Sequence, residues 1–396
     1  MFYSTVTALA LLGLGVNGQD VQTAPKAVDP LITSGKAVGS NMPTVGFGTW
    51  MLPNNDKGAE AVARAMKLGY RHFDGATAYT NQQAVGKGLA LGLKNNPHIK
   101  REELWITSKI WATRHKDVTG GIDINLKQLG LDYIDLMLVH FPVIFQGNSQ
   151  QPKKDDHGAP IANATVTVAE YDYLPMWAAM EAALSAGKIK HIGISNFNVT
   201  QIDDLLAHAK VKPYVHQIEA HPYLQDWKFY DYHTSKGLRL AAYAPLGNTN
   251  PEYHYRNWKS AGKAMLSDPT LSAIATARGC STAQVALAWN LARNVTTVVK
   301  AQNAQHAIEN YEARQTCKLT SEDLAKIKAL DQDGKGGKRY WDMCCAMDLP
   351  CYHGLQDGPV GPAAADYCED PWKNIKYNKE RTDLWLTKRP ACNALF

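Results

Sequence analysis

Four polar side chains stand at or just beyond the ends of successive apolar segments. Asp74 ends one segment and is followed by Tyr79, Lys109 ends the next, and His140 ends a third. Each has an ordinary structural explanation. Asp74 could cap a helix, Lys109 could be a solvated strand end, and His140 could be a buried core histidine. Their recurrence at successive segment ends favours a shared chemical role.

The four residue types form a set that can donate a proton. A tyrosine phenol ordinarily loses its proton at about pH 10, and a neighbouring ammonium lowers the pKa because it stabilises the phenolate. We therefore expect Lys109 to lower the pKa of Tyr79, with Asp74 as the counter-ion of Lys109. We expect His140 to donate a hydrogen bond to a substrate carbonyl oxygen, which Tyr79 protonates as hydride reaches the carbon.

Alternating strand and helix patterns position these residues. The apolar runs are nearly continuous, as in strands that are covered on both faces. About eight strand–helix units over roughly 300 residues predict an α/β fold of the (β/α)8 TIM-barrel type, in which reactive side chains lie at the C-terminal ends of the strands. We expect strands at 47–50, 70–74, 104–109, 134–140, 191–195, 215–219, 239–243 and 295–299. We expect helices at 59–68, 83–93, 122–129, 174–185, 202–209, 227–235, 271–277, 282–293, 304–310 and 321–330.

A doubly wound sheet is the alternative fold, and one motif bears on it. Gly13, Gly15 and Gly18 spell the G-x-G-x-x-G pattern of a phosphate-binding loop. Such a loop opens a helix, whereas the segment from Gln19 to Pro30 is polar and interrupted by proline. We therefore interpret these glycines as part of an N-terminal targeting segment.

Three short motifs surround the candidate residues. They are Phe73-Asp74-Gly-Ala-Thr-Ala-Tyr79 with Asn81 and Val85-Gly86 beyond it, Thr107-Ser-Lys109-Ile-Trp111, and Leu138-Val-His140-Phe-Pro142. Together they resemble the aldo-keto reductase superfamily over residues 38–331. The resemblance implies a catalytic tetrad of Asp74, Tyr79, Lys109 and His140. It also implies a barrel preceded by an N-terminal β-hairpin.

The same resemblance implies a nicotinamide cofactor. It assigns Ser195, Asn196 and Gln217 to the carboxamide group, and it assigns Tyr243 to stacking on the ring. Leu246, in the segment Ala-Tyr-Ala-Pro-Leu-Gly, is a further expected contact.

At the adenosine end, Lys300, Glu309 and Asn310 match the pattern of the family. Ala301 replaces a hydroxyl residue, and His306 stands where an arginine is expected. NADP(H) is the expected cofactor because Lys300 is present. NAD(H) remains possible, since a neutral histidine lacks the bidentate phosphate contact of arginine.

Aromatic residues are expected to line the substrate pocket. Trp50, Trp111 and Phe141 occupy positions where the family places such residues, beside His140, and Ala78 adds little bulk next to Tyr79. An apolar pocket of this kind suits aromatic or medium-chain aldehydes and ketones. The alternative is that these rings only fill the mouth of the barrel.

The N-terminus predicts a secretory signal at residues 1–18. The run from Val6 to Val16 is too short for a membrane span and suits a signal core, although no Lys or Arg precedes it. A disordered terminus is the alternative. Sequons at Asn163, Asn198 and Asn294 fit a glycoprotein. The expected location is therefore the secretory pathway or outside the cell, and otherwise the cytoplasm.

The cysteines are concentrated late in the chain. Cys280 and Cys317 lie in the body, and the other five of the seven lie in residues 332–396: Cys344, Cys345, Cys351, Cys368 and Cys392. We predict a Cys-rich C-terminal extension containing disulfides, with free thiols as the alternative. Zinc is rejected because paired C-x-x-C spacing is absent from the sequence. The sequence leaves the pairing open.

These observations predict a monomeric carbonyl reductase that acts on a small molecule with NADPH. The net charge of +5 is mild for 396 residues, so we expect neither nucleic acid nor, once the signal is removed, a membrane as partner. Two alternatives are a non-catalytic cofactor-binding module and a secreted barrel hydrolase with paired carboxylates such as Asp74 and Glu219. The intact tetrad argues against the first, and the expected cofactor residues have no role in the second.

Overall fold

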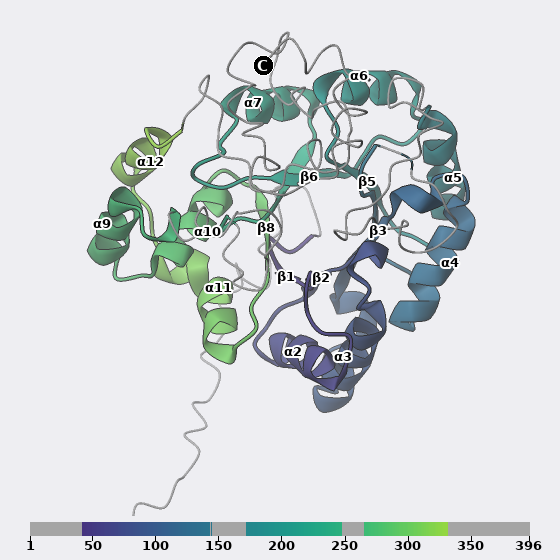
Figure 1. The fold of residues 1–396 in the computed structure, drawn as a ribbon, viewed down its shortest axis with the longest axis horizontal. Helices are drawn as coiled ribbons and strands as arrows, with labels where there is room; N and C mark the ends of the chain where they lie inside the picture. Colours follow the sequence, from purple (N-terminus) through teal and green to yellow (C-terminus); the bar gives the residue numbers. More distant parts are fainter. Residues whose placement is uncertain (1–41, 143, 145–171, 248–264, 332–396) are drawn as a thin grey trace, which may run out of the picture. The chain divides into compact units, whose positions relative to one another are not determined.

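The computed structural model describes residues 42–142, 144, 172–247 and 265–331. In these residues eight parallel strands close into a barrel, in which each strand pairs with its neighbours in sequence and β8 pairs with β1 (Figure 1). The strands are β1 (Val45–Gly48), β2 (His72–Asp74), β3 (Trp105–Ile110), β4 (Leu136–Val139), β5 (Ile192–Ser195), β6 (Val215–Glu219), β7 (Arg239–Tyr243) and β8 (Thr296–Val299). The predicted TIM barrel is confirmed.

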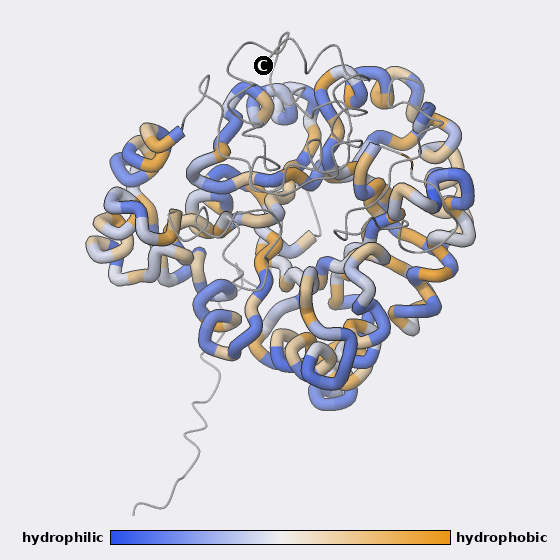
Figure 2. Tube along the Cα trace, in the orientation of Figure 1, coloured by the Kyte–Doolittle hydropathy of each residue, from blue (hydrophilic) through white to orange (hydrophobic). Residues whose placement is uncertain are grey.

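Helices follow the strands and surround the barrel (Figure 1). They are α2 (Asp56–Lys67), α3 (Gln82–Asn95), α4 (Val118–Leu129), α5 (Leu174–Ser185), α6 (Val199–His208), α7 (Trp227–Lys236), α9 (Pro269–Arg278), α10 (Thr282–Ala292), α11 (Ala304–Thr316) and α12 (Ser321–Lys328). Hydrophobic and hydrophilic residues are interspersed along most of the helices (Figure 2). Such helices bury one face against the strands.

Helix α2 shows how the sequence specifies one of these elements. The side chain of Asn55 caps the helix by accepting hydrogen bonds from the main-chain N–H groups of Lys57 and Gly58. Val62 and Met66 are fully buried one turn apart. In the adjoining α3, a Cβ atom added at Gly88 would lie 2.5 Å from the carbonyl oxygen of Ala59. The close packing of the two helices therefore requires glycine at that position.

The predicted elements agree closely with the observed ones. The bounds of α5, β6 and β7 are those expected, and the other described elements differ mainly at their ends. The predicted strands at 70–74 and 134–140 are shorter, because pairing begins only at His72 and Leu136. The remaining residues of these runs lie in the connections that lead into or out of the strands, and all of them except Arg71 are buried.

A second apolar cluster lies beside the barrel, on helices α9, α10 and α12. A disulfide there joins Cys280, between α9 and α10, to Cys317 at the end of α11, with 5.5 Å between the two Cα atoms. The expectation of a disulfide is thus supported at a place that the sequence did not indicate. By linking residues 37 positions apart in sequence, the disulfide encloses α10, β8 and α11 in one loop.

Several predictions fall outside the described residues. These are the signal at 1–18, the N-terminal hairpin, the sequon at Asn163 and the Cys-rich extension at 332–396. They stay predictions, as does the location of the protein. Of the other two sequons, Asn198 caps α6 and Asn294 follows α10. Among the described residues, every helix is too short or too polar to span a bilayer.

Candidate active site

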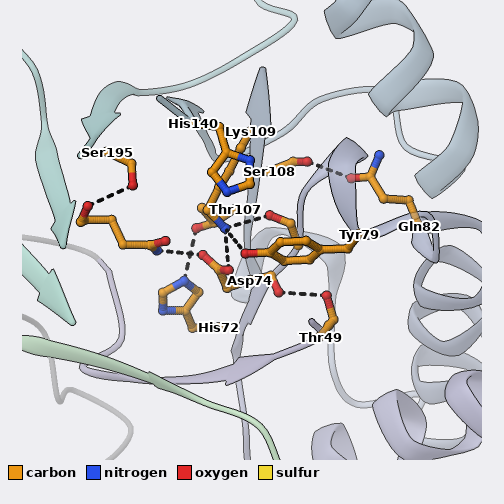
Figure 3. Close-up of polar contacts among 12 residues, drawn as sticks. Thr49, His72, Asp74, Tyr79, Gln82, Thr107, Ser108, Lys109, His140 and Ser195 are labelled. Atoms are coloured by element: carbon orange, nitrogen blue, oxygen red, sulfur yellow. Dashed lines mark hydrogen bonds and ion pairs between the residues drawn. The ribbon is translucent and has the colours of Figure 1, made fainter. Parts of the chain in front are cut away.

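The barrel brings the four predicted catalytic residues together. Asp74 is the last residue of β2, and Lys109 is the penultimate residue of β3. Tyr79 ends a short 3-10 helix, η1 (Thr77–Tyr79), just beyond β2, and His140 directly follows β4. Their side chains converge at the C-terminal ends of these strands (Figure 3), the end at which parallel barrels of this type hold their active sites.

A buried ion pair lies at the centre of this cluster. The Nζ atom of Lys109 is 2.5 Å from Oδ1 of Asp74, and both side chains are almost completely buried. The same ammonium donates to the carbonyl oxygen of Gly75 at 2.9 Å and to the hydroxyl oxygen of Tyr79 at 3.3 Å. An ammonium has three N–H donors, so each of them has an acceptor here, as a buried charge requires.

The pKa of Tyr79 is shifted in the direction opposite to the one expected. Burial, and next the carboxylate of Asp74, raise the pKa of the phenol well above its ordinary value. The expected lowering fails because both of these effects disfavour the phenolate. Burial also lowers the pKa of Lys109 itself. The Tyr79 phenol therefore keeps its proton at neutral pH, which is the state that a proton donor needs.

His140 is neutral in this environment. Burial lowers the pKa of its imidazole well below the ordinary value, and the nearby Lys109 and His115 lower it further. Its Nδ1 atom is buried and has no hydrogen-bond partner among the described residues. The edge of the ring approaches Tyr79, with the ring centroids 5.7 Å apart. A neutral imidazole can donate one hydrogen bond from a ring nitrogen.

Asn196 connects the candidate cofactor residues to His140. Its Nδ2 group donates to the main-chain oxygen of His140 at 2.9 Å and to Oγ of Ser195 at 3.0 Å, while its Oδ1 accepts from the hydroxyl of Tyr243 at 2.9 Å. The backbone of Asn196 has φ +63°, in the left-handed region. The site thus joins the ends of β4, β5 and β7 through one amide side chain.

Gln217 joins the candidate cofactor residues to the ion pair. Its Nε2 group donates to Oδ2 of Asp74 at 2.8 Å, so both oxygens of that carboxylate have donors. The main-chain oxygen of Gln217 accepts a hydrogen bond from Oγ of Ser195 at 2.8 Å. Since its Nε2 is committed to Asp74, the side-chain oxygen of Gln217 is the atom suited to accept a hydrogen bond from a carboxamide.

The other predicted cofactor residues lie at the end of β8 and the start of α11. Lys300 directly follows β8, and Asn303 caps α11 by accepting from the main-chain N–H of His306 at 2.7 Å. The exposed ring of His306 contacts the side-chain amide of Asn303 at 3.1 Å. Glu309 and Asn310 lie one turn further along α11. A lysine beside a helix N-terminus favours an anion, since the helix dipole adds to its charge.

Two aromatic residues of the predicted substrate pocket pack against His140. The rings of Trp111 and Phe141 each lie with their centroids 5.0 Å from that of the imidazole. Both are largely buried, while Trp50 and Leu246 are partly exposed. The ring of Phe141 therefore stacks on the imidazole, while the rings of Trp111 and of the half-buried Tyr79 meet it at steep angles.

A polar network that the sequence reading missed supports the segment carrying Tyr79. Thr77 donates to Oδ1 of Asn125 in α4 at 3.0 Å, and Ser108 lies 2.6 Å from the same atom. Ser108 also lies 2.6 Å from Oε1 of Gln82 (Figure 3). The sequence feature that could have predicted this network is Asn125, a polar residue on the apolar face of a predicted helix.

Asn81, noted in the sequence only as part of the motif, has a structural role. Its Nδ2 group donates to the main-chain oxygens of Thr49 and Leu52 at 2.7 and 2.9 Å. These bonds tie the start of α3 to the loop after β1, which also carries Trp50. Elsewhere in the described ranges, no group of three or more His, Cys, Asp and Glu side chains is arranged to hold a metal ion.

The barrel carries a phenol, an ammonium, a carboxylate and an imidazole at its strand ends. This combination defines an enzyme of the TIM-barrel class.

The model of the Aldo/keto reductase family matches residues 44–332, and the chain belongs to this family of oxidoreductases. It is 37% identical over 296 residues to an aldo/keto reductase of Synechocystis, covering 74% of this chain and 87% of that protein. It is 36% identical over 318 residues to aldo-keto reductase family 1 member A1-A of Danio rerio, covering 77% and 94%.

Solved structures agree with this assignment. The aldose reductase of Schistosoma japonicum is 32% identical, with a TM-score of 0.66 over 78% of this chain and 94% of that one. An aldo-keto reductase of Bombyx mori in complex with NADP is 30% identical, with a TM-score of 0.64 over 78% and 95%.

The ion pair should show strong coupling in the free energy of unfolding. Lys109→Met leaves a buried carboxylate without its counter-ion, and Asp74→Asn leaves the ammonium unpaired, so each variant is expected to lose about 3–5 kcal/mol. The double variant contains neither charge and should lose clearly less than the sum of the two single losses. Urea denaturation of the four proteins measures this. Additive losses would show that the two charges do not depend on each other.

Proposed function

We propose that the protein reduces aldehydes or ketones to alcohols with NADPH, with Tyr79 as the proton donor. The observation that carries this proposal is the convergence of a protonated phenol, its lysine partner and a neutral histidine at one end of the barrel. The proposal follows the chemistry of the family and the presence of NADP in the Bombyx mori relative.

The side chains present fit a nicotinamide. Ser195, Asn196 and Gln217 place a hydroxyl and two amide groups next to the tetrad, and a carboxamide needs both donors and acceptors of this kind. Tyr243 is partly exposed at the end of β7, with its hydroxyl held by Asn196. We assign these residues to the nicotinamide, and Leu246, Lys300, His306, Glu309 and Asn310 to the rest of the cofactor.

When bound, the cofactor supplies the hydride. The protein orients the substrate and moves the proton. His140, as a neutral imidazole, donates a hydrogen bond to the carbonyl oxygen and fixes its position against Tyr79. Tyr79 then transfers its hydroxyl proton to that oxygen as negative charge develops there. The ammonium of Lys109, 3.3 Å from the phenol oxygen, stabilises the phenolate that remains.

The surroundings favour substrates with an apolar group next to the carbonyl. Trp111 and Phe141 pack around His140, and together with Trp50 they offer aromatic surface where the remainder of the substrate would lie. Charged substrates would lose hydration at such an apolar surface.

The proposed activity is tested directly with purified protein. NADPH is titrated while its fluorescence is followed, and a panel of aromatic and medium-chain aldehydes is then added while cofactor oxidation is recorded. We expect saturable binding and turnover of at least part of the panel. Binding without turnover of any aldehyde would favour the alternative, a non-catalytic module of the same family. The absence of binding would contradict both.

The cofactor preference depends on His306. The exposed imidazole cannot form the bidentate phosphate contact that an arginine makes, so we expect only a modest preference for NADPH over NADH in the parent protein. His306→Arg should lower the KM for NADPH by about tenfold, equivalent to about 1.4 kcal/mol, and leave the KM for NADH unchanged. Steady-state kinetics with both cofactors measures this. An equal change for NADH would show that the residue does not contact the group that distinguishes them.

A further inference from the structure

Two histidines that play no part in the proposed chemistry lie behind the candidate cofactor site. His216 is in β6, one residue before Gln217, and His233 is in α7. Both are completely buried. Because alternate residues of a strand point to opposite faces, His216 points away from the barrel interior while Gln217 points to Asp74.

The two rings form a directed chain of hydrogen bonds. The main-chain N–H of Phe197 donates to Nε2 of His216 at 3.1 Å. Nδ1 of His216 lies 2.8 Å from Nε2 of His233, and Nδ1 of His233 lies 2.6 Å from the main-chain oxygen of Phe229. Since the first group can only donate and the last can only accept, each ring carries its one proton on Nδ1.

This chain requires both rings to be neutral. A second proton on either imidazole would place two N–H groups against each other. Burial lowers the pKa of His233 to about 4 and that of His216 well below its ordinary value. The same assignment of protons therefore holds throughout the neutral pH range.

The chain of hydrogen bonds begins at Phe197, next to a backbone turn whose conformation is unfavourable by itself. Phe197 follows Asn196, whose φ of +63° is uncommon for a residue other than glycine. Such a conformation persists where the surroundings hold it in place. On one side, the N–H of Asn196 bonds to the main-chain oxygen of Gln217 at 3.3 Å. On the other side, His216 holds the N–H of Phe197.

We propose that His216, braced by His233, is a positioning residue for the cofactor, because it holds the turn at Asn196 in the conformation in which Ser195 and Asn196 receive the nicotinamide carboxamide. This inference rests on the proposed NADPH-dependent function. The inference also gives α7 a role, because His233 contacts His216 from that helix, which lies on the outer side of β6 (Figure 1).

Two substitutions at His216 separate positioning from packing. His216→Phe keeps a ring of similar size and removes the acceptor, so the buried N–H of Phe197 loses its partner. His216→Gln places an amide oxygen at about the reach of Nε2 and is expected to restore the acceptor. Met66→Ala, in α2 on the other side of the barrel, is the matched control, because removing this fully buried side chain lowers stability without touching the turn.

The measurement is the dissociation constant for two ligands, NADPH and its reduced 3-acetylpyridine analogue, in which a methyl ketone replaces the carboxamide. We expect the parent protein to prefer NADPH. In His216→Phe the dissociation constant for NADPH should rise by about fivefold, which corresponds to the loss of one hydrogen bond of about 1 kcal/mol. The dissociation constant for the analogue should change little, so the variant should no longer prefer NADPH over the analogue. His216→Gln and Met66→Ala should keep the preference.

Each other outcome has a defined meaning. If His216→Phe folds and retains the parental preference, or if Met66→Ala loses it equally, the proposed positioning role is wrong. If His216→Phe does not fold, His233→Leu replaces it, because this variant removes only the brace and should weaken the preference in the same direction. Unchanged binding by that variant would also overturn the inference. Failure of the parent protein to bind NADPH would instead contradict the proposed function.

Discussion

The ion pair between Lys109 and Asp74 is the interaction on which the rest of the site depends. Removing two charges from water is costly, and their attraction compensates only when the remaining donors and acceptors are also satisfied. Here the ammonium has three acceptors, and the second carboxylate oxygen has a donor in Gln217. The position of Tyr79 follows from this arrangement, since its hydroxyl is the third acceptor. The same pair links the ends of β2, β3 and β6.

The barrel is the scaffold that makes such a pair possible. Closure of the sheet between β1 and β8 leaves no free edge, so the strand ends are fixed relative to one another. Polar residues then connect the ends sideways: Asn196 joins β5 to β4 and β7, and Asn125 joins α4 to the segment of Tyr79. Each of these bonds involves a side-chain amide, as donor or as acceptor, that would be costly to bury unpaired. Tyr79, the candidate cofactor residues and their supports therefore form one connected set.

Much of this arrangement could be predicted from the sequence. The strands are continuous apolar runs that end in polar residues, so Asp74, Lys109 and His140 stand out from their neighbours. The reading failed where the physics depends on three-dimensional surroundings. The pKa of Tyr79 rises because burial and the carboxylate of Asp74 both disfavour the phenolate, and no spacing in the sequence shows how strong these effects are. The disulfide between Cys280 and Cys317, and the contact between His216 and His233, join residues of different elements that no local pattern pairs.

The proposed chemistry depends on proton donation by Tyr79. Its most direct test is the rate of carbonyl reduction by Tyr79→Phe in a single turnover with saturating NADPH, compared with the parent protein. The substitution removes only the hydroxyl, so we expect a rate lower by about 10²–10⁴-fold, the usual contribution of general acid catalysis, with the dissociation constant for NADPH unchanged. If a variant that binds NADPH normally reduces the carbonyl at the parental rate, Tyr79 is not the proton donor.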